Sequence, residues 1–247
     1  MKQRKFSPNS VSLSGVDDAE IAQFNALAAE WWNPEGEMAP LHRMNPTRLS
    51  YIVETIKNKF NRINKLSVLD VGCGGGLVAE PLARLGMQVT GIDGAAELIG
   101  VARSHAKSQK LAITYENELT SDQIARGKTY DVVLALEVIE HVPDPAQFVA
   151  EIAQLVKPGG LVIFSTLNRT ASSFAFGIVA AEYVLRWLPA GTHNWQKFIK
   201  PSELFEFCIA AKLSPTGTKG LTYHPRREEF VLDDKNLNVN YFLTATK

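Results

Sequence analysis

Short apolar runs alternate with amphipathic segments along most of this chain, and the alternation predicts strands separated by helices. Residues 130–136, YDVVLAL, are almost wholly apolar, which is typical of a central parallel strand buried on both faces. The other predicted strands are residues 67–71, 88–93, 112–115 and 161–166, with two closing strands at 213–223 and 239–246. We therefore predict an α/β fold with a doubly wound, Rossmann-like sheet of seven strands, in which the last strand can run antiparallel. For residues 230–237 the pattern does not distinguish a short strand from a loop.

Helical spacing of apolar residues fills the gaps between these strands. The predicted helices are residues 77–85, 95–109, 145–155 and 201–211, with two more at 19–32 and 47–60 before the first strand. Pro81 should kink or shorten the first of them, because proline forfeits a backbone hydrogen bond. Residues 37–46 are expected to be an irregular loop.

The N-terminal region has two open interpretations. Residues 1–16 are polar and predict a flexible tail, and residues 17–62 predict a helical cap. That cap could be a layer over the sheet edge, or a lid over a ligand in which Arg48 holds a carboxylate. The spacing alone does not choose between them.

A glycine-rich turn follows the first predicted strand, in the run SVLDVGCGGG at residues 67–76. Gly72 and Gly74 allow a tight turn and a close approach of a ligand to the backbone. Asp93 ends the next predicted strand, where a carboxylate can accept hydrogen bonds from both hydroxyls of a ribose. This arrangement predicts a nucleoside site.

The spacing of the glycines limits the choice of nucleoside. It is not the G-x-G-x-x-G of dinucleotide sites, and no lysine follows as in a P-loop. Asp70 would repel a phosphate but suits a ligand that carries an ammonium and a sulfonium. We therefore favour S-adenosylmethionine over the alternatives, which are an NAD site and a purely structural turn.

A second group of chemically active side chains follows the central strand at Glu137, Glu140 and His141. His141, with Glu140, could act as general base toward an attacking hydroxyl. Alternatively the three side chains could bind a divalent ion that acidifies a phenol, or they could form a solvated loop. The strand does not end in the Asn/Asp-Pro-Pro-Tyr run of nucleobase-amine methylases, so methyl transfer to oxygen or carbon is favoured.

Residues 168–200 predict an insertion after the fifth strand. Within it, residues 172–189 are apolar but carry Glu182 and Arg186, so the segment is too short and too charged to span a bilayer. It could be a lid over the substrate, or an interfacial helix that dips Phe174 and Leu185 into an anionic membrane surface.

Composition adds few constraints. The 247 residues suit one domain, residues 17–247, and the 26 basic and 26 acidic residues give no net charge, which argues against nucleic acid as a partner. Cys73 and Cys208 form neither a disulfide framework nor a metal motif, which indicates a reducing compartment. No signal peptide or transmembrane run is visible at the N-terminus.

Several short runs occur together along the chain. They are WW at 31–32 with EG at 35–36, PLHR at 40–43, NP at 45–46 with Arg48, LDVGCGGG at 69–76, EHVPDP at 140–145, STLNR at 165–169, TH at 192–193, FIKP at 198–201 and NY at 240–241. In these runs the chain resembles the ubiquinone-biosynthesis O-methyltransferase family, class I methyltransferases that act on polyprenylated phenols and catechols. The glycine run marks only the superfamily, whereas the runs before residue 50 are far more specific.

The resemblance implies further expectations. Cofactor contacts are expected at positions matching Arg48, Gly72, Asp93 and Leu136. In eukaryotic relatives the positions of Glu137, Glu140 and His141 are associated with a divalent ion, so magnesium or zinc stays an open alternative here. The implied substrates are a 2-polyprenyl-6-hydroxyphenol and 3-demethylubiquinol, one for each of two O-methylations.

The same resemblance implies a setting for the reaction. The expected location is cytoplasmic, at the inner face of the cell membrane, with other ubiquinone-biosynthesis proteins as candidate partners. The alternatives are a soluble O-methyltransferase of small phenols and a binding module for S-adenosylmethionine without turnover.

Overall fold

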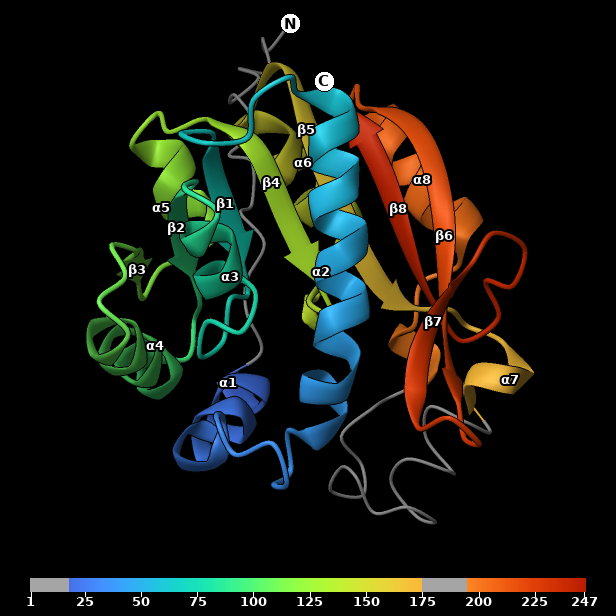
Figure 1. Ribbon diagram of the computed structural model, residues 1–247. Coiled ribbons are helices and arrows are strands. Elements are labelled where there is room, and N and C mark those ends of the chain that lie inside the picture. The colour runs from blue at the N-terminus through green and yellow to red at the C-terminus, as the bar shows by residue number, and fades with distance from the viewer. Residues whose placement is uncertain (1–17, 175–194) are drawn as a thin grey trace, which may run out of the picture.

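In a computed structural model of the protein, one mixed β-sheet is covered by helices on both faces (Figure 1). The structure describes residues 18–174 and 195–247. Within these residues eight strands form the sheet in the order β3-β2-β1-β4-β5-β8-β6-β7. Their bounds are β1 Ser67–Val71, β2 Gln88–Ile92, β3 Thr114–Glu116, β4 Tyr130–Leu136, β5 Val156–Leu167, β6 Ser214–His224, β7 Glu229–Asp233 and β8 Asn240–Thr246.

The direction of the strands confirms the predicted fold class. Strands β1 to β5 run parallel, and β8 lies between β5 and β6, antiparallel to both. The sheet has eight strands and not the predicted seven. The additional strand is β7, whose residues 229–233 pair with β6 as a hairpin. The hydroxyl of Thr47 also donates to the carbonyl of Phe230 at 2.8 Å, which ties this edge strand to the helical layer.

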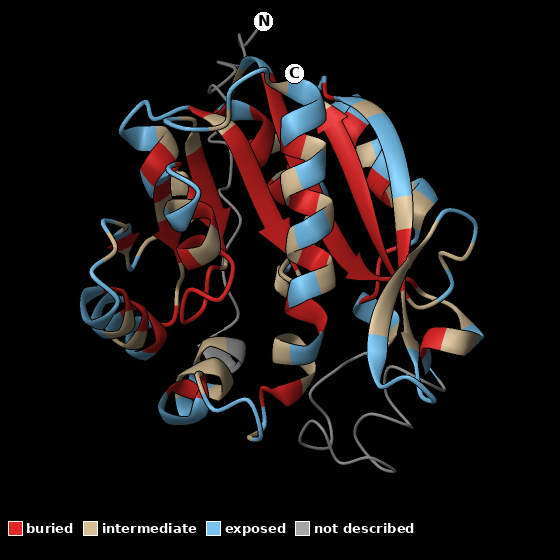
Figure 2. Ribbon diagram, viewed as in Figure 1, coloured by how far each residue is buried: buried red, intermediate tan, exposed pale blue. Residues whose placement is uncertain are grey.

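The helices divide between the two faces of the sheet. On one face lie α2 (Ala39–Lys59), α3 (Ala79–Arg84) and α4 (Ala96–Ser108), and on the other lie α5 (Thr120–Ala125), α6 (Pro145–Leu155) and α8 (Pro201–Ala210). Val132 and Phe242 pack toward the first group, whereas their chain neighbours Val133 and Leu243 pack toward the second. The central strands are therefore buried from both sides, as Figure 2 shows.

The N-terminal region departs from the sequence prediction. Helix α1 covers Asp18–Ala26 and a 3-10 turn covers Ala28–Glu30, so the first helix is shorter than expected. The predicted loop at residues 37–46 was wrong, because α2 already begins at Ala39 and continues through Pro46. Pro40 lies in its first turn, where the missing N–H costs nothing, and Pro46 removes a single bond from a 21-residue helix.

Smaller elements were missed or placed differently. Helix α5 and the 3-10 turns Ile139–His141 and Trp195–Lys197 were not predicted. The short α7 (Ala171–Ser173) overlaps the start of the helix considered at residues 172–189. Helix α3 is shorter than predicted, and Pro81 falls in its first turn. Most of the predicted insertion, residues 175–194, lies outside the described residues. None of the described helices has the length and apolar character needed to cross a membrane.

Candidate functional site

Both predicted groups of functional residues lie at the carboxyl edge of the parallel strands. Strand β1 pairs with β2 on one side and β4 on the other, with Val71 level with Ile92 and Ala135. The glycine turn after β1 is therefore flanked by Asp93 after β2 and by residues 137–141 after β4. Leu136 is buried at the end of β4. The sheet topology thus gathers the predicted side chains from three strands.

The glycine turn has the backbone conformation that its sequence predicts. Gly72, Gly74 and Gly76 have positive φ angles of 68°, 52° and 95°, a region that side chains with a Cβ rarely adopt. The N–H groups of Gly72 and Cys73 both donate to the carbonyl of Ile92. This fixes the turn against the end of β2.

An aromatic pair from the N-terminal region covers the turn. A Cβ added at Gly74 or Gly75 would lie 2.2 Å from the Trp31 ring, so the indole rests directly on the glycines. The indole N–H of Trp32 donates to the carbonyl of Gly75 at 3.1 Å. The Trp32 ring stacks on His105 of α4 with 3.6 Å between ring centroids. The N-terminal region therefore covers the glycine turn.

Asp93 is positioned by backbone N–H groups. One carboxylate oxygen accepts from Gly74 at 2.9 Å and the other from Ala95 at 2.8 Å. Burial raises the pKa of Asp93, and these two hydrogen bonds act against the rise. Because each carboxylate oxygen has a second lone pair, both can still accept a hydroxyl.

Asp70 and Arg48 bring opposite charges into the same buried region. Both side chains are less than 5% exposed, at 3% and 4%. Burial raises the pKa of Asp70 to about 7, with the Arg48 guanidinium opposing the rise and the Asp93 carboxylate adding to it. Burial also lowers the pKa of Arg48, against the pull of Glu137 and Asp70.

These two charges have hydrogen-bonding capacity left over. Arg48 donates Nε and Nη2 to the side-chain oxygen of Asn45 at 3.3 and 3.0 Å. Among the described residues, Nη1 has no hydrogen-bond acceptor and the Asp70 carboxylate has no donor. A ligand that carries both a carboxylate and an ammonium would satisfy the pair, which is the combination expected of a methionine moiety.

Glu137 is held rigidly in an unusual backbone conformation. Its φ of 54° lies in the left-handed region, which is uncommon for a residue with a side chain. The Ser165 hydroxyl donates to its carboxylate at 2.6 Å, and the Asn240 amide donates to both oxygens at 3.1 and 3.0 Å. The Asn240 oxygen is buried and has no partner within the described chain.

Glu140 lies beside Glu137 and is the more deeply buried of the two, at 3% exposure. The Thr166 hydroxyl donates to it at 2.9 Å. Burial raises the pKa of Glu140 to about 7, Glu137 adds to the rise, and His141 opposes it. The His141 ring is partly exposed and meets Phe24 edge-on at 5.3 Å between ring centroids.

The metal alternative gains no support from this geometry. Among the described residues, Glu137, Glu140 and His141 are not gathered closely enough to hold a metal ion, and neither is any other group of three such side chains. The Glu137 oxygens already accept from Ser165 and Asn240. The prediction of magnesium or zinc therefore stays untested.

Three residues that contact the predicted site residues were not singled out from the sequence. Asn45 and Asn240 are present in the motif runs at 45–46 and 240–241, but no role was assigned to either. Ser165, from the run at 165–169, contacts Glu137 across the β4–β5 pair. Asn240 and Ser165 lie 103 and 28 residues from Glu137, so only the tertiary fold brings these pairs together. Asn45 lies three residues before Arg48 on α2, which is a local helical contact.

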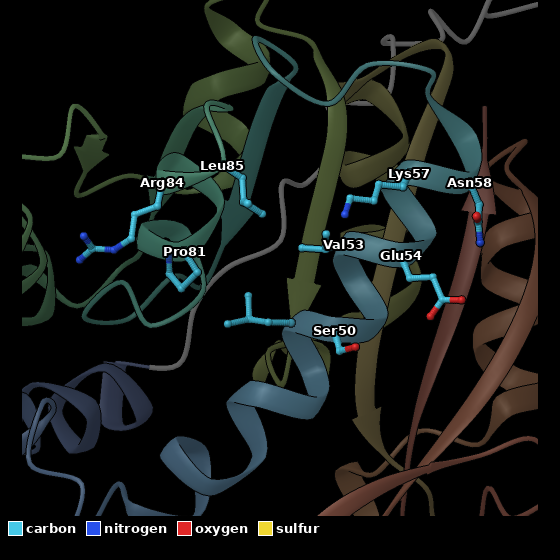
Figure 3. A pocket seen from close by; sticks show the side chains of 9 residues that line it. Ser50, Val53, Glu54, Lys57, Asn58, Pro81, Arg84 and Leu85 are labelled. Carbon is cyan, nitrogen blue, oxygen red and sulfur yellow. The ribbon is translucent and has the colours of Figure 1, made fainter.

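The groove in Figure 3 lies elsewhere. It has a volume of about 570 Å³ and lies between α2 and α3, and its lining includes apolar side chains such as Val53 and Leu85 and charged ones such as Lys57 and Arg84. None of the predicted site residues lines it.

Comparisons with known proteins place this geometry in context. A family model described as a methyltransferase domain matches residues 24–208. A protein named ubiquinone biosynthesis O-methyltransferase from Cereibacter sphaeroides is 48% identical over 243 residues, covering 96% of this chain and 98% of the relative. A protein of the same name from Dinoroseobacter shibae is 47% identical, covering 94% of this chain and 96% of the relative.

Solved structures show the same fold at low identity. The magnesium protoporphyrin IX methyltransferase of Synechocystis PCC 6803, solved with bound SAH, has a TM-score of 0.67 at 19% identity and covers 94% of this chain and 100% of its own. A methyltransferase from Thermotoga maritima described as S-adenosylmethionine-dependent has a TM-score of 0.63 at 15% identity, covering 91% and 98%.

Proposed function

The chain belongs to the ubiquinone biosynthesis O-methyltransferase family, and from this membership we propose that it transfers a methyl group from S-adenosylmethionine to a phenolic oxygen of a polyprenylated ubiquinone precursor. We extend the proposal to both O-methylations of that route, on a 2-polyprenyl-6-hydroxyphenol and on 3-demethylubiquinol. Identity of 45–48% over almost the whole chain supports the assignment.

The observation that carries the cofactor assignment is the charge pair beside the glycine turn. Arg48 offers a free Nη1 donor to a carboxylate, and the Asp70 carboxylate is available to an ammonium. Asp93 can accept ribose hydroxyls, while Gly72 and Gly74 let the ligand approach the backbone. Leu136, at the end of β4, supplies an apolar contact. These residues fit S-adenosylmethionine better than a dinucleotide, because nothing cationic in the turn at 70–76 would receive a pyrophosphate.

Proton removal is assigned to the Glu140–His141 pair. S-adenosylmethionine supplies a sulfonium methyl, so the bond from sulfur to methyl breaks as the bond from phenolic oxygen to methyl forms. The phenolic proton must then leave, and Glu140, with a pKa of about 7, is suited to accept it near neutral pH. His141 lies next to it at the partly exposed end and can pass the proton to solvent.

Turnover with labelled S-adenosylmethionine tests this proposal. Short-prenyl versions of both substrates and an unprenylated catechol should be compared, with and without a chelator. We expect methylation of both prenylated compounds and a lower kcat/KM on the catechol. Equal rates would favour a methyltransferase of small phenols, and cofactor binding without turnover on any of them would favour the binding module. Loss of activity with chelator, restored by magnesium or zinc, would revive the metal alternative.

The role of Glu140 has a matched control in the same chain. Glu140→Gln should lower kcat by roughly 10²–10⁴-fold, the usual contribution of a general base. Glu151 is also buried and also accepts from a threonine hydroxyl, that of Thr120, but it lies on α6 away from the strand ends. Glu151→Gln should therefore leave kcat within about threefold, since it removes a buried carboxylate without touching the substrate. Equal losses in the two variants would refute the assignment.

We also propose that the insertion at 168–200 guides the protein to an anionic membrane surface on the cytoplasmic side. Its apolar residues 172–189 support this, as does Phe174, which is 49% exposed. Sedimentation with anionic liposomes should pellet the wild type more than the double variant Phe174→Glu/Leu185→Glu. Phe205→Glu, which changes an equally exposed phenylalanine on α8, is the control and should sediment as the wild type does. Equal pelleting of wild type and double variant would contradict the idea.

A further inference from the structure

The series of backbone hydrogen bonds that leads from the glycine turn into helix α3 skips one carbonyl, that of Leu77. The amide of Glu80 donates to the carbonyl of Gly76, and the amide of Leu82 donates to the carbonyl of Val78. Between these two, the carbonyl of Leu77 would need the amide of residue 81, which is a proline and has no N–H. Leu77 is buried, so its carbonyl would be left without a partner, at a cost in stability.

Asn45 supplies the missing donor from a different helix. Its side-chain amide donates to the Leu77 carbonyl at 2.8 Å, across 32 residues of sequence. Asn45 is itself buried, at 9% exposure. The side chain therefore replaces a backbone bond that Pro81 cannot make, immediately after the glycine turn.

The other end of the same amide group fixes Arg48. The Asn45 oxygen accepts from both Nε and Nη2 of the guanidinium. Because Nε and Nη2 share one edge of a planar, rigid group, these two bonds determine where Nη1 points. The neutral amide suits both neighbours at once, with a donor toward a carbonyl and an acceptor toward a cation.

We propose that Asn45 is a positioning residue, which sets the Arg48 guanidinium relative to the glycine turn so that Nη1 meets the cofactor carboxylate. The inference rests on the proposed cofactor function and adds a residue that acts only through Arg48. It predicts that Asn45 matters for ligands with an amino-acid moiety and not for the adenosine portion.

Calorimetric binding to two ligands separates this role from a purely structural one. S-adenosylhomocysteine carries the carboxylate, whereas 5′-methylthioadenosine has the same nucleoside and thioether without it. Asn45→Ala should weaken S-adenosylhomocysteine roughly tenfold to a hundredfold, since a hydrogen bond to a charged group is lost. Binding of 5′-methylthioadenosine should change less than about twofold. Arg48→Gln should show the same selectivity, and the double variant should be no weaker than Arg48→Gln alone.

A second measurement tests the contact with Leu77. Asn45→Ala should lower Tm by roughly 2–4 °C in the wild type. In a Pro81→Ala background this loss should be at least halved, because residue 81 then offers an N–H to the Leu77 carbonyl. That background also allows ligand binding to be measured if Asn45→Ala alone does not fold. Asn45→Asp keeps the acceptor for Arg48 but removes the donor to the Leu77 carbonyl. It should therefore have a lower Tm but still prefer S-adenosylhomocysteine over 5′-methylthioadenosine.

The outcomes distinguish the effect of Asn45 on Arg48 from its contact with the residues before α3. Equal weakening of both ligands by Asn45→Ala, with additive effects of Asn45 and Arg48, would overturn the positioning role. An equal loss of Tm in the wild-type and Pro81→Ala backgrounds would overturn the link to α3. If the wild type bound neither ligand, the proposed cofactor itself would be refuted.

Discussion

A carboxylate such as that of Asp70 is costly where it lies, because burial removes water from a charge without providing a donor in exchange. Its pKa of about 7, against 3.8 for an ordinary aspartate, reflects that cost. Proteins accept such costs mainly at functional sites. Roles for Asp70 and Asp93 could be predicted from the sequence, because Asp70 lies near the end of a recognisable strand and Asp93 directly follows the next one. The role of Asn45 could not, since it depends on a carbonyl orphaned by a proline 36 positions away.

Asp70 predicts an unusual dependence of stability on pH. A carboxyl group whose pKa is higher in the folded state keeps its proton while the unfolded chain loses it, so its contribution to stability falls as the pH rises from 3.8 to about 7. Between pH 5.5 and 8 the wild type should lose about 2 kcal/mol at this position. Asp70→Asn removes that loss. In urea unfolding of the ligand-free protein, the free energy of unfolding of the variant should therefore rise relative to that of the wild type as the pH increases.

Asp131, at the amino end of β4, is the control for the pH dependence predicted for Asp70. Partial burial would raise its pKa, but hydrogen bonds from Ser67 and Lys157 lower it. Its stabilising effect is therefore present above pH 3.8 and is lost only below it, as the pH falls through the lowered pKa. Asp131→Asn should destabilise the protein equally at pH 5.5 and pH 8. A constant difference between wild type and Asp70→Asn across this range would contradict the assignment of Asp70.

At the scale of elements, hydrophobic pattern predicted the strands well and short polar helices poorly. Strands β1, β2 and β4 have nearly the predicted bounds, because each contains β-branched or other apolar residues and is followed by a turn. Helix α5 has only six residues, TSDQIA, without an apolar stripe long enough to show a period. The start of α2 was missed because residues 37–46 were predicted as an irregular loop, whereas the helix begins at Ala39 with Pro40 in its first turn and Pro46 inside it.

The contact between the N-terminal region and the glycine turn predicts a steric effect. Gly75 has no positive φ, so an alanine there meets no backbone strain, but its Cβ would overlap the Trp31 ring. Gly75→Ala should therefore destabilise the protein by about 1–3 kcal/mol and should shift tryptophan emission to the red as the indole is displaced. Chemical unfolding and fluorescence measure the two effects.

Two further variants control this prediction. Gly100→Ala lies in α4 with nothing within 4 Å of the added Cβ, and it should stabilise the protein slightly because alanine is the better helix former. Trp31→Leu should recover part of the stability lost in Gly75→Ala, by making room beside the turn. No recovery would mean that the clash with Trp31 is not the cause.

For the whole molecule, the topology separates stability from chemistry. The carboxyl ends of the strands carry the candidate site, while their amino ends are tied by Ser67, Asp131 and Lys157. The α/β fold and the position of the site were predictable, because parallel strands all direct their carboxyl ends to one edge. Strand β7 was not predictable in the same way, because its pairing depends on a hairpin with β6 and on a contact with α2 rather than on its own hydrophobic pattern.

This arrangement predicts that cofactor binding stabilises the entire domain. S-adenosylhomocysteine at one hundred times its Kd should add about 2.7 kcal/mol to the free energy of unfolding. For a chain of this size the gain corresponds to roughly 5–11 °C in Tm, measurable by scanning calorimetry. NAD at the same concentration should produce no shift, and a shift with NAD alone would instead favour a dinucleotide site.

The position of β8 in the sheet has a consequence for folding during synthesis on the ribosome. Residues 240–246 pair with both β5 and β6. Until these residues leave the ribosomal exit tunnel, β5 and β6 therefore lack the strand that lies between them. Until then a nascent chain exposes two unpaired strand edges, to which other chains can add. Correct maturation of this sheet therefore waits until residues 240–246 have emerged.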